Sequence, residues 1–168
     1  MIAPADNIAD VLPDWLCAQP RWAPWKAKWN AKRGKFDKIP VRPDAPECGL
    51  STAKVDQWGT FEAALAACKK HDLAGVGIVL TGIKGVTGID LDGANGPDGR
   101  PQPWAREILR DLAALGAYLE VSPSGNGYRG FLRAQLGQGD WDNHDQGIEV
   151  YEGAKSRFLT VTGREVKP

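Results

Sequence analysis

The sequence predicts an α+β fold in which strands outnumber helices. Short apolar runs typical of strands recur along the 168 residues, whereas only two segments have the spacing of long helices. The 20 glycines and 12 prolines are concentrated between these segments, which indicates short elements joined by tight turns. Two helices are too few for a doubly wound parallel sheet, so α+β is favoured. The length and the 42% hydrophobic content suit a single domain with a substantial core.

The N-terminal third is expected to hold one short helix and two strands around a polar hairpin. In order, these are a helix near residues 14–18, a strand near 21–26, a hairpin at 30–36, a strand ending at 38–41 and a loop at 43–52. Four of the seven tryptophans lie here: Trp15, Trp22, Trp25 and Trp29. Core packing is the favoured interpretation because Trp has a large burial energy, and base stacking on exposed rings is the alternative.

The two long helices have clear start signals. Thr60 is a good N-cap for a helix that runs to about His71, and Pro101 or Pro103 suits the first turn of a second helix that stops at Gly116. Cys68 and His71 form a C-x-x-H pair, but they are expected to be ordinary helix residues rather than zinc ligands. The apolar positions of the second helix are Ile108, Leu109, Leu112 and Leu115. The remaining strand candidates are residues 75–80, 86–92, 118–121, 128–132, 148–151 and 157–162.

Charge and cysteine content restrict the function classes. The 21 basic and 21 acidic residues balance, so a globally basic nucleic-acid binder is excluded. Eight basic residues and only one acid nevertheless fall between Arg21 and Arg42, and such a basic edge suits local polyanion binding. Three widely spaced cysteines indicate a reducing compartment. With no secretory signal and no long apolar run, we expect a cytoplasmic protein without a membrane partner.

The strongest chemical motif is the pair Asp90 and Asp92. Residues two apart in a strand share a face, so both carboxylates are expected side by side while Ile89 and Leu91 are buried opposite. Adjacent carboxylates repel unless a cation lies between them, and Mg²⁺ or Mn²⁺ suits an oxygen-lined site. The alternative is a strand that runs into an ordinary turn at Asp92.

A Ser- and Gly-rich segment at residues 121–131 is the second motif. Its backbone N–H groups can cradle phosphate, and Arg129 adds a forked donor, while a plain hairpin turn is the alternative. The segment formally matches G-x-G-x-x-G, but no helix follows, so a Rossmann site is rejected. The sequence also lacks the P-loop motif of ATPases.

Two further segments carry polar side chains that suit metal or phosphate binding. Glu149 alternates with apolar neighbours, and if its strand lies beside that of Asp90, three carboxylates converge as in two-metal phosphoryl transfer. An exposed glutamate on a half-buried strand is the alternative. Arg157 is placed to reach phosphate or to line a solvated sheet edge. His71 and His144 are expected to be solvated surface residues.

Taken in order, these segments resemble the primase-polymerase domain of the archaeo-eukaryotic primase superfamily, in particular the bifunctional domains of phages and mobile elements. The resemblance spans about residues 14–164. It rests on the Trp22/Trp25 strand and on residues 38–40, 51–54, 58–64, 75–80, 88–93, 120–127, 148–151 and 157–163.

The resemblance implies an RRM-like catalytic sheet with flanking helices, and template-directed primer synthesis or extension on single-stranded DNA from nucleoside triphosphates. Asp90, Asp92 and Glu149 match the catalytic Mg²⁺ or Mn²⁺ ligands. The residues expected to contact the nucleotide are Lys38, Ser124, Gly125, Gly127, Arg129 and Arg157. The family commonly has His where this chain has Arg129, which keeps its charge near pH 7. A helicase partner is expected on another segment or protein, since its motifs are absent here.

Two other functions stay open. A non-catalytic module on the same fold would hold single strands or nucleotides, as the arginine and the basic, Trp-rich segment 21–42 suggest. A metal-dependent nuclease would use the same carboxylates, but it leaves the Ser- and Gly-rich turn without a role. We also expect the chain to be the N-terminal part of a longer replication protein.

Overall fold

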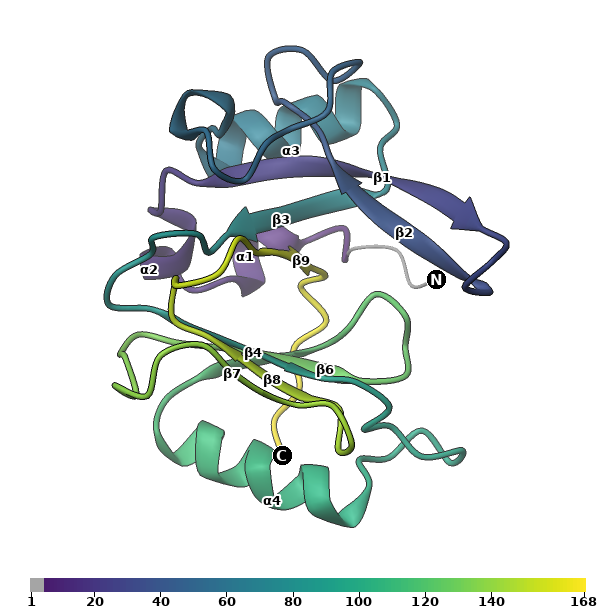
Figure 1. The fold of residues 1–168 in the computed structure, drawn as a ribbon, viewed down its shortest axis with the longest axis vertical. Helices are drawn as coiled ribbons and strands as arrows, with labels where there is room; N and C mark the ends of the chain where they lie inside the picture. Colours follow the sequence, from purple (N-terminus) through teal and green to yellow (C-terminus); the bar gives the residue numbers. More distant parts are fainter. Residues whose placement is uncertain (1–4) are drawn as a thin grey trace.

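The computed structural model describes residues 5–168 and shows two antiparallel sheets stacked on each other, which confirms the α+β class (Figure 1). The first sheet has the strand order β2-β1-β3-β9 and the second β5-β6-β4-β8-β7. The first sheet consists of β1 (Trp22–Asn30), β2 (Lys35–Pro40), β3 (Gly75–Val79) and β9 (Phe158–Val161). The second consists of β4 (Thr87–Leu91), β5 (Tyr118–Val121), β6 (Tyr128–Leu132), β7 (Trp141–Asn143) and β8 (Ile148–Tyr151). This division into two sheets does not follow from the strand pattern alone.

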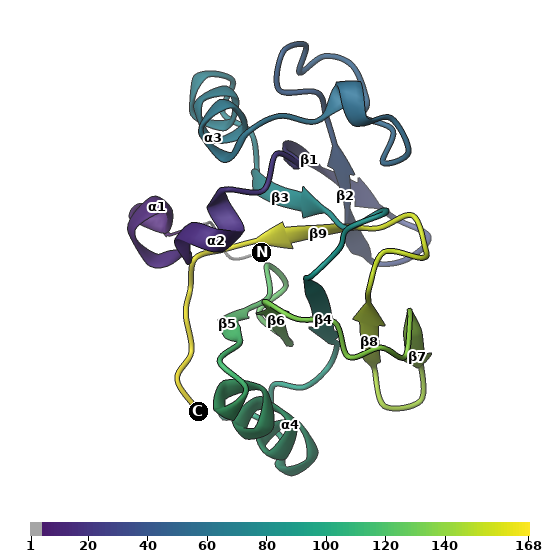
Figure 2. The same cartoon turned by 90° about the vertical axis from the view of Figure 1, so that its left-hand side faces the viewer.

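Helices cover the outer faces of both sheets. Helix α3 (Phe61–Lys70) packs on the first sheet, and α4 (Pro103–Ala114) packs on the second (Figure 1). The short helices α1 (Ile8–Val11) and α2 (Asp14–Cys17) lie to one side, as Figure 2 shows, and a 3-10 turn spans Val55–Gln57. Across residues 5–168, no helix combines the length and apolarity needed to cross a bilayer.

The core consists of two apolar clusters, one on each face of the second sheet. Ile89 and Leu91 of β4 pack with Leu109 of α4 in one of them. Phe131 and Tyr151 project the other way, into the cluster shared with the first sheet and α3. Because alternate residues of each strand project to opposite faces, both faces of the second sheet are packed against apolar side chains near its centre.

Local signals placed most elements correctly. The Thr60 hydroxyl accepts a hydrogen bond from the Ala63 N–H at 3.2 Å and caps α3, and Pro103 occupies the first turn of α4. The helix that was expected to carry Leu115 and stop at Gly116 ends at Ala114, so Leu115 is its C-cap residue and is 61% exposed. The sulfhydryl of Cys68 donates to the Leu73 carbonyl at 3.4 Å. The sequence analysis missed α1 and the edge strand β7, which are too short to show a periodic pattern.

The tryptophans of β1 divide into two groups. Trp22 and Trp25 are buried, and Trp22 makes an edge-to-face contact with Phe61 of α3 at 4.9 Å between ring centroids. Core packing is therefore confirmed for these two. Trp29, four residues further along the strand, is 55% exposed. Core packing therefore does not explain the tryptophan at position 29.

A buried carboxylate, Glu120, ties the C-terminal segment to the second sheet. It accepts hydrogen bonds from the Tyr118 hydroxyl at 3.0 Å and from the N–H groups of Thr162 and Gly163 at 2.9 Å each. Burial raises the pKa of Glu120 to about 7, although the hydrogen bonds from Gly163 and Thr162 and the charge of Arg129 oppose the rise. The folded state therefore holds a proton that the unfolded chain releases near pH 4.3.

We expect the free energy of unfolding to fall as pH rises from about 4.3 to 7, by roughly 3 kcal/mol through Glu120. The sign follows because the folded state binds more protons than the unfolded state in this window. Glu120→Gln keeps the acceptor oxygen without the titration, so its unfolding free energy is expected to be flatter across this range in urea titrations. The exposed Glu107→Gln of α4 is the matched control. An unchanged slope in Glu120→Gln would contradict this assignment.

Candidate functional site

A row of charged residues crosses the second sheet. Strand pairing sets Glu120 opposite Arg129, Arg129 opposite Asp90, Asp90 opposite Glu149, and Glu149 opposite Asp142. Directly paired residues of antiparallel strands project to the same face, so all five side chains lie on the face toward the first sheet. The sequence analysis made the convergence of Asp90 and Glu149 conditional on neighbouring strands, and β4 and β8 are neighbours.

Asp92 lies just past the end of β4, two residues beyond Asp90. Its N–H donates to the Gly147 carbonyl at 2.8 Å, so the backbone is fixed against the β7–β8 turn. A Cβ on Gly127 would collide with the carbonyl oxygen of Leu91, and one on Gly147 would collide with that of Asp92. The two glycines thus let two turns close on both sides of this backbone. Close packing against the Leu91 carbonyl therefore requires glycine at position 127.

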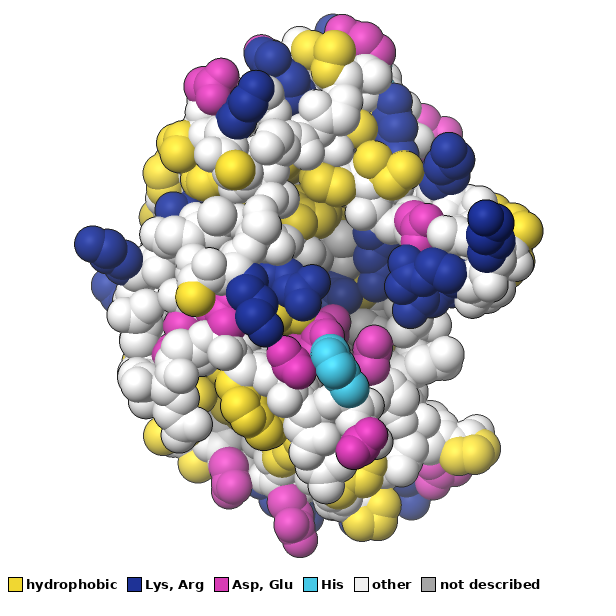
Figure 3. Space-filling view, viewed as in Figure 1, with side chains coloured by type: hydrophobic (Ala, Val, Ile, Leu, Met, Phe, Trp, Pro, Cys, Tyr) yellow, Lys and Arg dark blue, Asp and Glu magenta, His cyan; other side chains and the backbone are white. Residues whose placement is uncertain are grey.

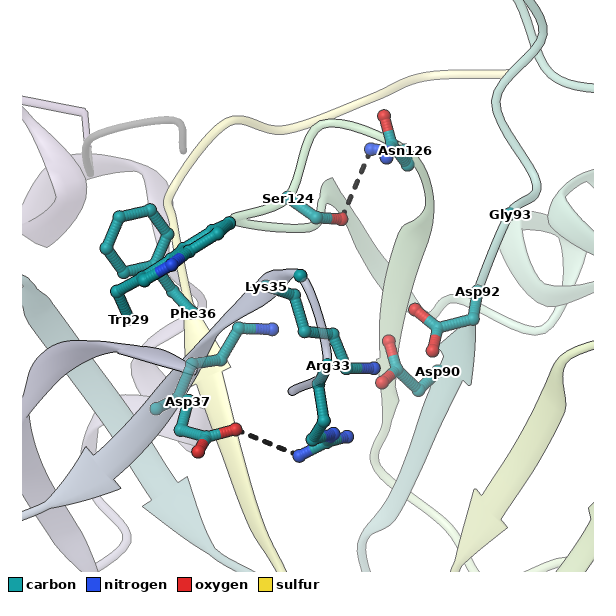
Figure 4. Close-up of a pocket in the computed structure, with 12 residues that line it drawn as sticks. Trp29, Arg33, Lys35, Phe36, Asp37, Asp90, Asp92, Gly93, Ser124 and Asn126 are labelled. Atoms are coloured by element: carbon teal, nitrogen blue, oxygen red, sulfur yellow. Dashed lines mark hydrogen bonds and ion pairs between the residues drawn. The ribbon is translucent and has the colours of Figure 1, made fainter. Parts of the chain in front are cut away.

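The Asp92 carboxylate has no direct bonding partner among the described residues. No hydrogen bond or ion pair reaches it from residues 5–168, and it faces the same cleft as Asp90 (Figure 4). Burial raises the pKa of the Asp92 carboxyl, and the charge of Asp90 raises it further, whereas Lys35, Lys38 and Arg129 oppose the rise. A cation bound here would lower the electrostatic cost of ionising the Asp92 carboxyl.

Arg129 is the buried partner of Asp90. Its Nε donates to Asp90 Oδ1 at 3.1 Å, and its Nη1 donates to the Thr160 carbonyl at 2.6 Å and to the Thr160 hydroxyl. The side chain is 4% exposed. These contacts join β6, β4 and β9 and so connect the two sheets. Because most of its donors are occupied by the protein, Arg129 neutralises Asp90 in this structure and does not offer phosphate the open fork that the sequence suggested.

The opposite wall of the cleft is basic and aromatic. A cavity of about 580 Å³ lies between the β1–β2 hairpin and the ends of β4 and β5. Figure 3 shows Lys and Arg side chains along one lip and Asp and Glu side chains along the other. Burial lowers the pKa of Lys38 to about 8; Arg129 adds to this, while Asp90 and Asp92 oppose it. Lys38, which the sequence analysis predicts to contact the nucleotide, therefore lies in the same cavity as Asp90 and Asp92.

The Ser- and Gly-rich segment is the turn of the β5–β6 hairpin and borders the same cleft. The Ser124 hydroxyl accepts from the Asn126 N–H at 3.2 Å and lies 2.9 Å from the Ser122 hydroxyl. Gly125 has a φ of 79° and its carbonyl accepts from the Asn95 amide at 2.8 Å. Ser124 and Asn126 line the cleft, whereas the cavity lining does not include Gly125 or Gly127. The turn is a plain hairpin in form with a polar edge at the cavity.

The predicted third carboxylate, Glu149, makes its own contacts on β8. It accepts a hydrogen bond from the Tyr151 hydroxyl, and its Oε1 lies 4.0 Å from Nδ1 of His144. The guanidinium of Arg157 lies over the Tyr151 ring at 4.8 Å, and its Nε is buried without a hydrogen-bond partner among residues 5–168. Glu149 and Arg157 thus lie together through Tyr151, outside the residues that line the cavity around Asp92.

The donor set fits a hard divalent cation held by two carboxylates. Within the described chain, no three His, Cys, Asp or Glu side chains are grouped closely enough to form a complete metal centre. Mg²⁺ commonly takes one or two carboxylates together with substrate phosphates and water. Asp90 and the unpartnered Asp92 supply such a pair at a cavity large enough for a nucleotide. A bound cation would polarise a phosphate oxygen and lower the pKa of a coordinated hydroxyl.

Several cavity residues were not found from sequence. Lys35 and Asn126 line the cavity, and Asp142 completes the charged row. Lys35 lies in the basic segment that was noted only as a whole, and Asp142 lies in an unrecognised edge strand. No family model matches this chain, and a search of curated proteins finds no match.

Proposed function

We propose that this chain is a metal-dependent nucleotidyltransferase domain that makes or extends primers on single-stranded DNA. One observation carries the proposal: the carboxylate of Asp92, which has no hydrogen-bond or ion-pair partner among residues 5–168, lies beside Asp90 in a cavity whose opposite wall carries Lys35 and Lys38. A cation on the carboxylates and ammonium groups opposite them are complementary to a nucleoside triphosphate. The proposal takes the second sheet as the counterpart of the RRM-like catalytic sheet that the resemblance to primase-polymerase domains implies.

Each group has a defined task in this proposal. Asp90 and Asp92 hold Mg²⁺ or Mn²⁺, which supplies Lewis-acid activation when bound. Lys38 and Lys35 neutralise phosphate charge, and the Ser124 hydroxyl and Asn126 at the hairpin edge add polar contacts. Arg129 fixes the orientation of Asp90 through its hydrogen bond. Glu149 lies opposite Asp90 on the neighbouring strand β8. It accepts a hydrogen bond from Tyr151, whose ring contacts Arg157, at the margin of the site.

The test is synthesis by the purified chain with single-stranded DNA, labelled nucleotides and Mg²⁺ or Mn²⁺. We expect product only when cation, template and nucleotides are all present, and none after chelation of the cation. Asp90→Asn should yield no product, and because it also breaks the buried pair with Arg129, circular dichroism must show that the assayed variant is folded. Asp111→Asn on the outer face of α4 is the matched control and should retain activity. Product that persists after chelation, or in folded Asp90→Asn, would contradict the proposal.

A second candidate is a non-catalytic module that binds single strands or nucleotides. The favouring observation is the ion pair between Arg129 and Asp90, which already neutralises one of the two carboxylates. This candidate predicts salt-dependent binding of single-stranded DNA without incorporation. The synthesis assay and a binding assay on the same preparation therefore distinguish the two functions.

A further inference from the structure

The β1–β2 ribbon extends beyond the core and presents two aromatic rings to solvent. Trp29 and Phe36 face each other across the ribbon and are 55% and 42% exposed. Their ring centroids are 5.1 Å apart in an edge-to-face arrangement. Figure 1 shows the ribbon projecting to one side of the two-sheet body. Core packing within this chain therefore does not explain why two large aromatic side chains lie together on its surface.

The aromatic pair lies on the cleft side of the ribbon. Residues two apart in a strand share a face, so Trp29 lies with Trp25, and Phe36 lies with Lys38. The charge of Lys38 interacts with both Asp90 and Asp92. Trp29 and Phe36 also line the same cavity as the two aspartates (Figure 4). The rings therefore form the outer part of the wall that faces the carboxylates.

The ribbon also carries the lysine side chains of residues 21–42, which have no ion-pair partner in the described part of the chain. Arg21 donates to the carbonyls of Val79 and Thr81, and Arg33 and Arg42 pair with Asp37 and Asp44 at 2.9 and 2.7 Å. The five remaining ammonium groups of this segment form no ion pair with residues 5–168, and they belong to Lys26, Lys28, Lys32, Lys35 and Lys38. Lys35 and Lys38 line the cavity together with the two rings, whereas Lys26 and Lys28 lie on the opposite face of the ribbon. Unpaired cations beside exposed rings are complementary to a polyanion that also carries flat apolar groups.

We infer that the ribbon binds single-stranded nucleic acid, with a base stacked on Trp29 and Phe36 and the phosphates beside Lys35 and Lys38. This inference rests on the proposed function and assigns the strand-binding surface of that site. Stacking on aromatic side chains tolerates any base, and the phosphate contacts are independent of sequence. The strand would then pass from the ribbon into the cavity at Asp90 and Asp92.

The test is fluorescence anisotropy of a labelled dT oligonucleotide and of an abasic strand of equal length, without divalent cation or nucleotides. We expect Trp29→Ala/Phe36→Ala to weaken binding of the dT strand about tenfold or more, in line with the loss of stacking. Binding of the abasic strand should change little, since it has no base to stack. The single variant Trp29→Phe, which keeps an aromatic ring, should retain most of the parental affinity for the dT strand. Trp141→Ala, which removes an exposed ring from β7, is the matched control.

Equal losses for both strands, parental affinity in the double variant, or a similar loss in Trp141→Ala would overturn the inference. Thermal unfolding of each variant shows whether the fold persists. The binding assay omits cation and nucleotides, so it separates the inference from the proposed function. Failure of synthesis with this binding pattern intact would refute only the nucleotidyltransferase proposal, and synthesis with unaltered binding in the double variant would refute only the ribbon assignment.

Discussion

Replacing Arg129 with methionine is expected to destabilise the fold by about 3–5 kcal/mol, the cost typical of breaking a buried ion pair. The variant leaves the Asp90 carboxylate buried without its cation and removes the donor to the Thr160 carbonyl. Since Thr160 lies on β9 and Asp90 on β4, the change also loosens the contact between the two sheets. Urea unfolding at neutral pH measures the effect.

A double-mutant cycle isolates the pair itself. We expect Asp90→Asn/Arg129→Met to recover part of the lost stability, because the unpaired charge is then gone. Arg133→Met, on the exposed residue just beyond β6, is the matched control and should be nearly neutral. A loss of less than about 1 kcal/mol in Arg129→Met, below the range typical of breaking a buried pair, would show that the contact is not structural.

Asp92→Asn is expected to separate activity from stability. Its carboxylate lacks a partner among residues 5–168 and its pKa is raised by burial and by Asp90, so removing the charge should leave the unfolding free energy unchanged or slightly higher. Incorporation of nucleotides should fall by roughly a hundredfold or more, because even the outer contacts of metal sites commonly cost 10–100-fold.

The measurements are urea unfolding and nucleotide incorporation on the same preparation. Asp111→Asn on α4 controls for loss of one negative charge at a distance. An Asp92→Asn variant that loses stability in step with activity would mean that Asp92 serves the fold. Parental activity would remove Asp92 from the site.

Local features of the fold were readable from sequence where they depend on short-range chemistry. The Thr60 cap, the start of α4 at Pro103 and the alternation of Ile89 and Leu91 with the aspartates all follow from neighbouring residues. The division of the strands between two sheets depends on long-range pairing, such as β3 with β9, that no local pattern encodes. Edge strand β7 has only three residues and shows no alternation to detect.

The candidate site was predictable to the same extent. Spacing placed Asp90 and Asp92 on one face, and alternation placed Glu149 on the matching face of its strand. The role of Arg129 was not predictable, because its partners Asp90 and Thr160 come from strands whose order only the fold defines. The same holds for Gly127 and Gly147, whose requirement comes from contact with the backbone around Asp92.

The most direct measurement is extension of a labelled primer on four templates that differ only at the first unpaired base, with the 168-residue chain, Mn²⁺ and all four nucleotides supplied singly. We predict that each template directs incorporation of its complementary nucleotide, and that the Asp92→Asn variant extends none of them. Incorporation that ignores the template base, or no extension on any template while the chain binds the strand, would contradict a template-directed nucleotidyltransferase.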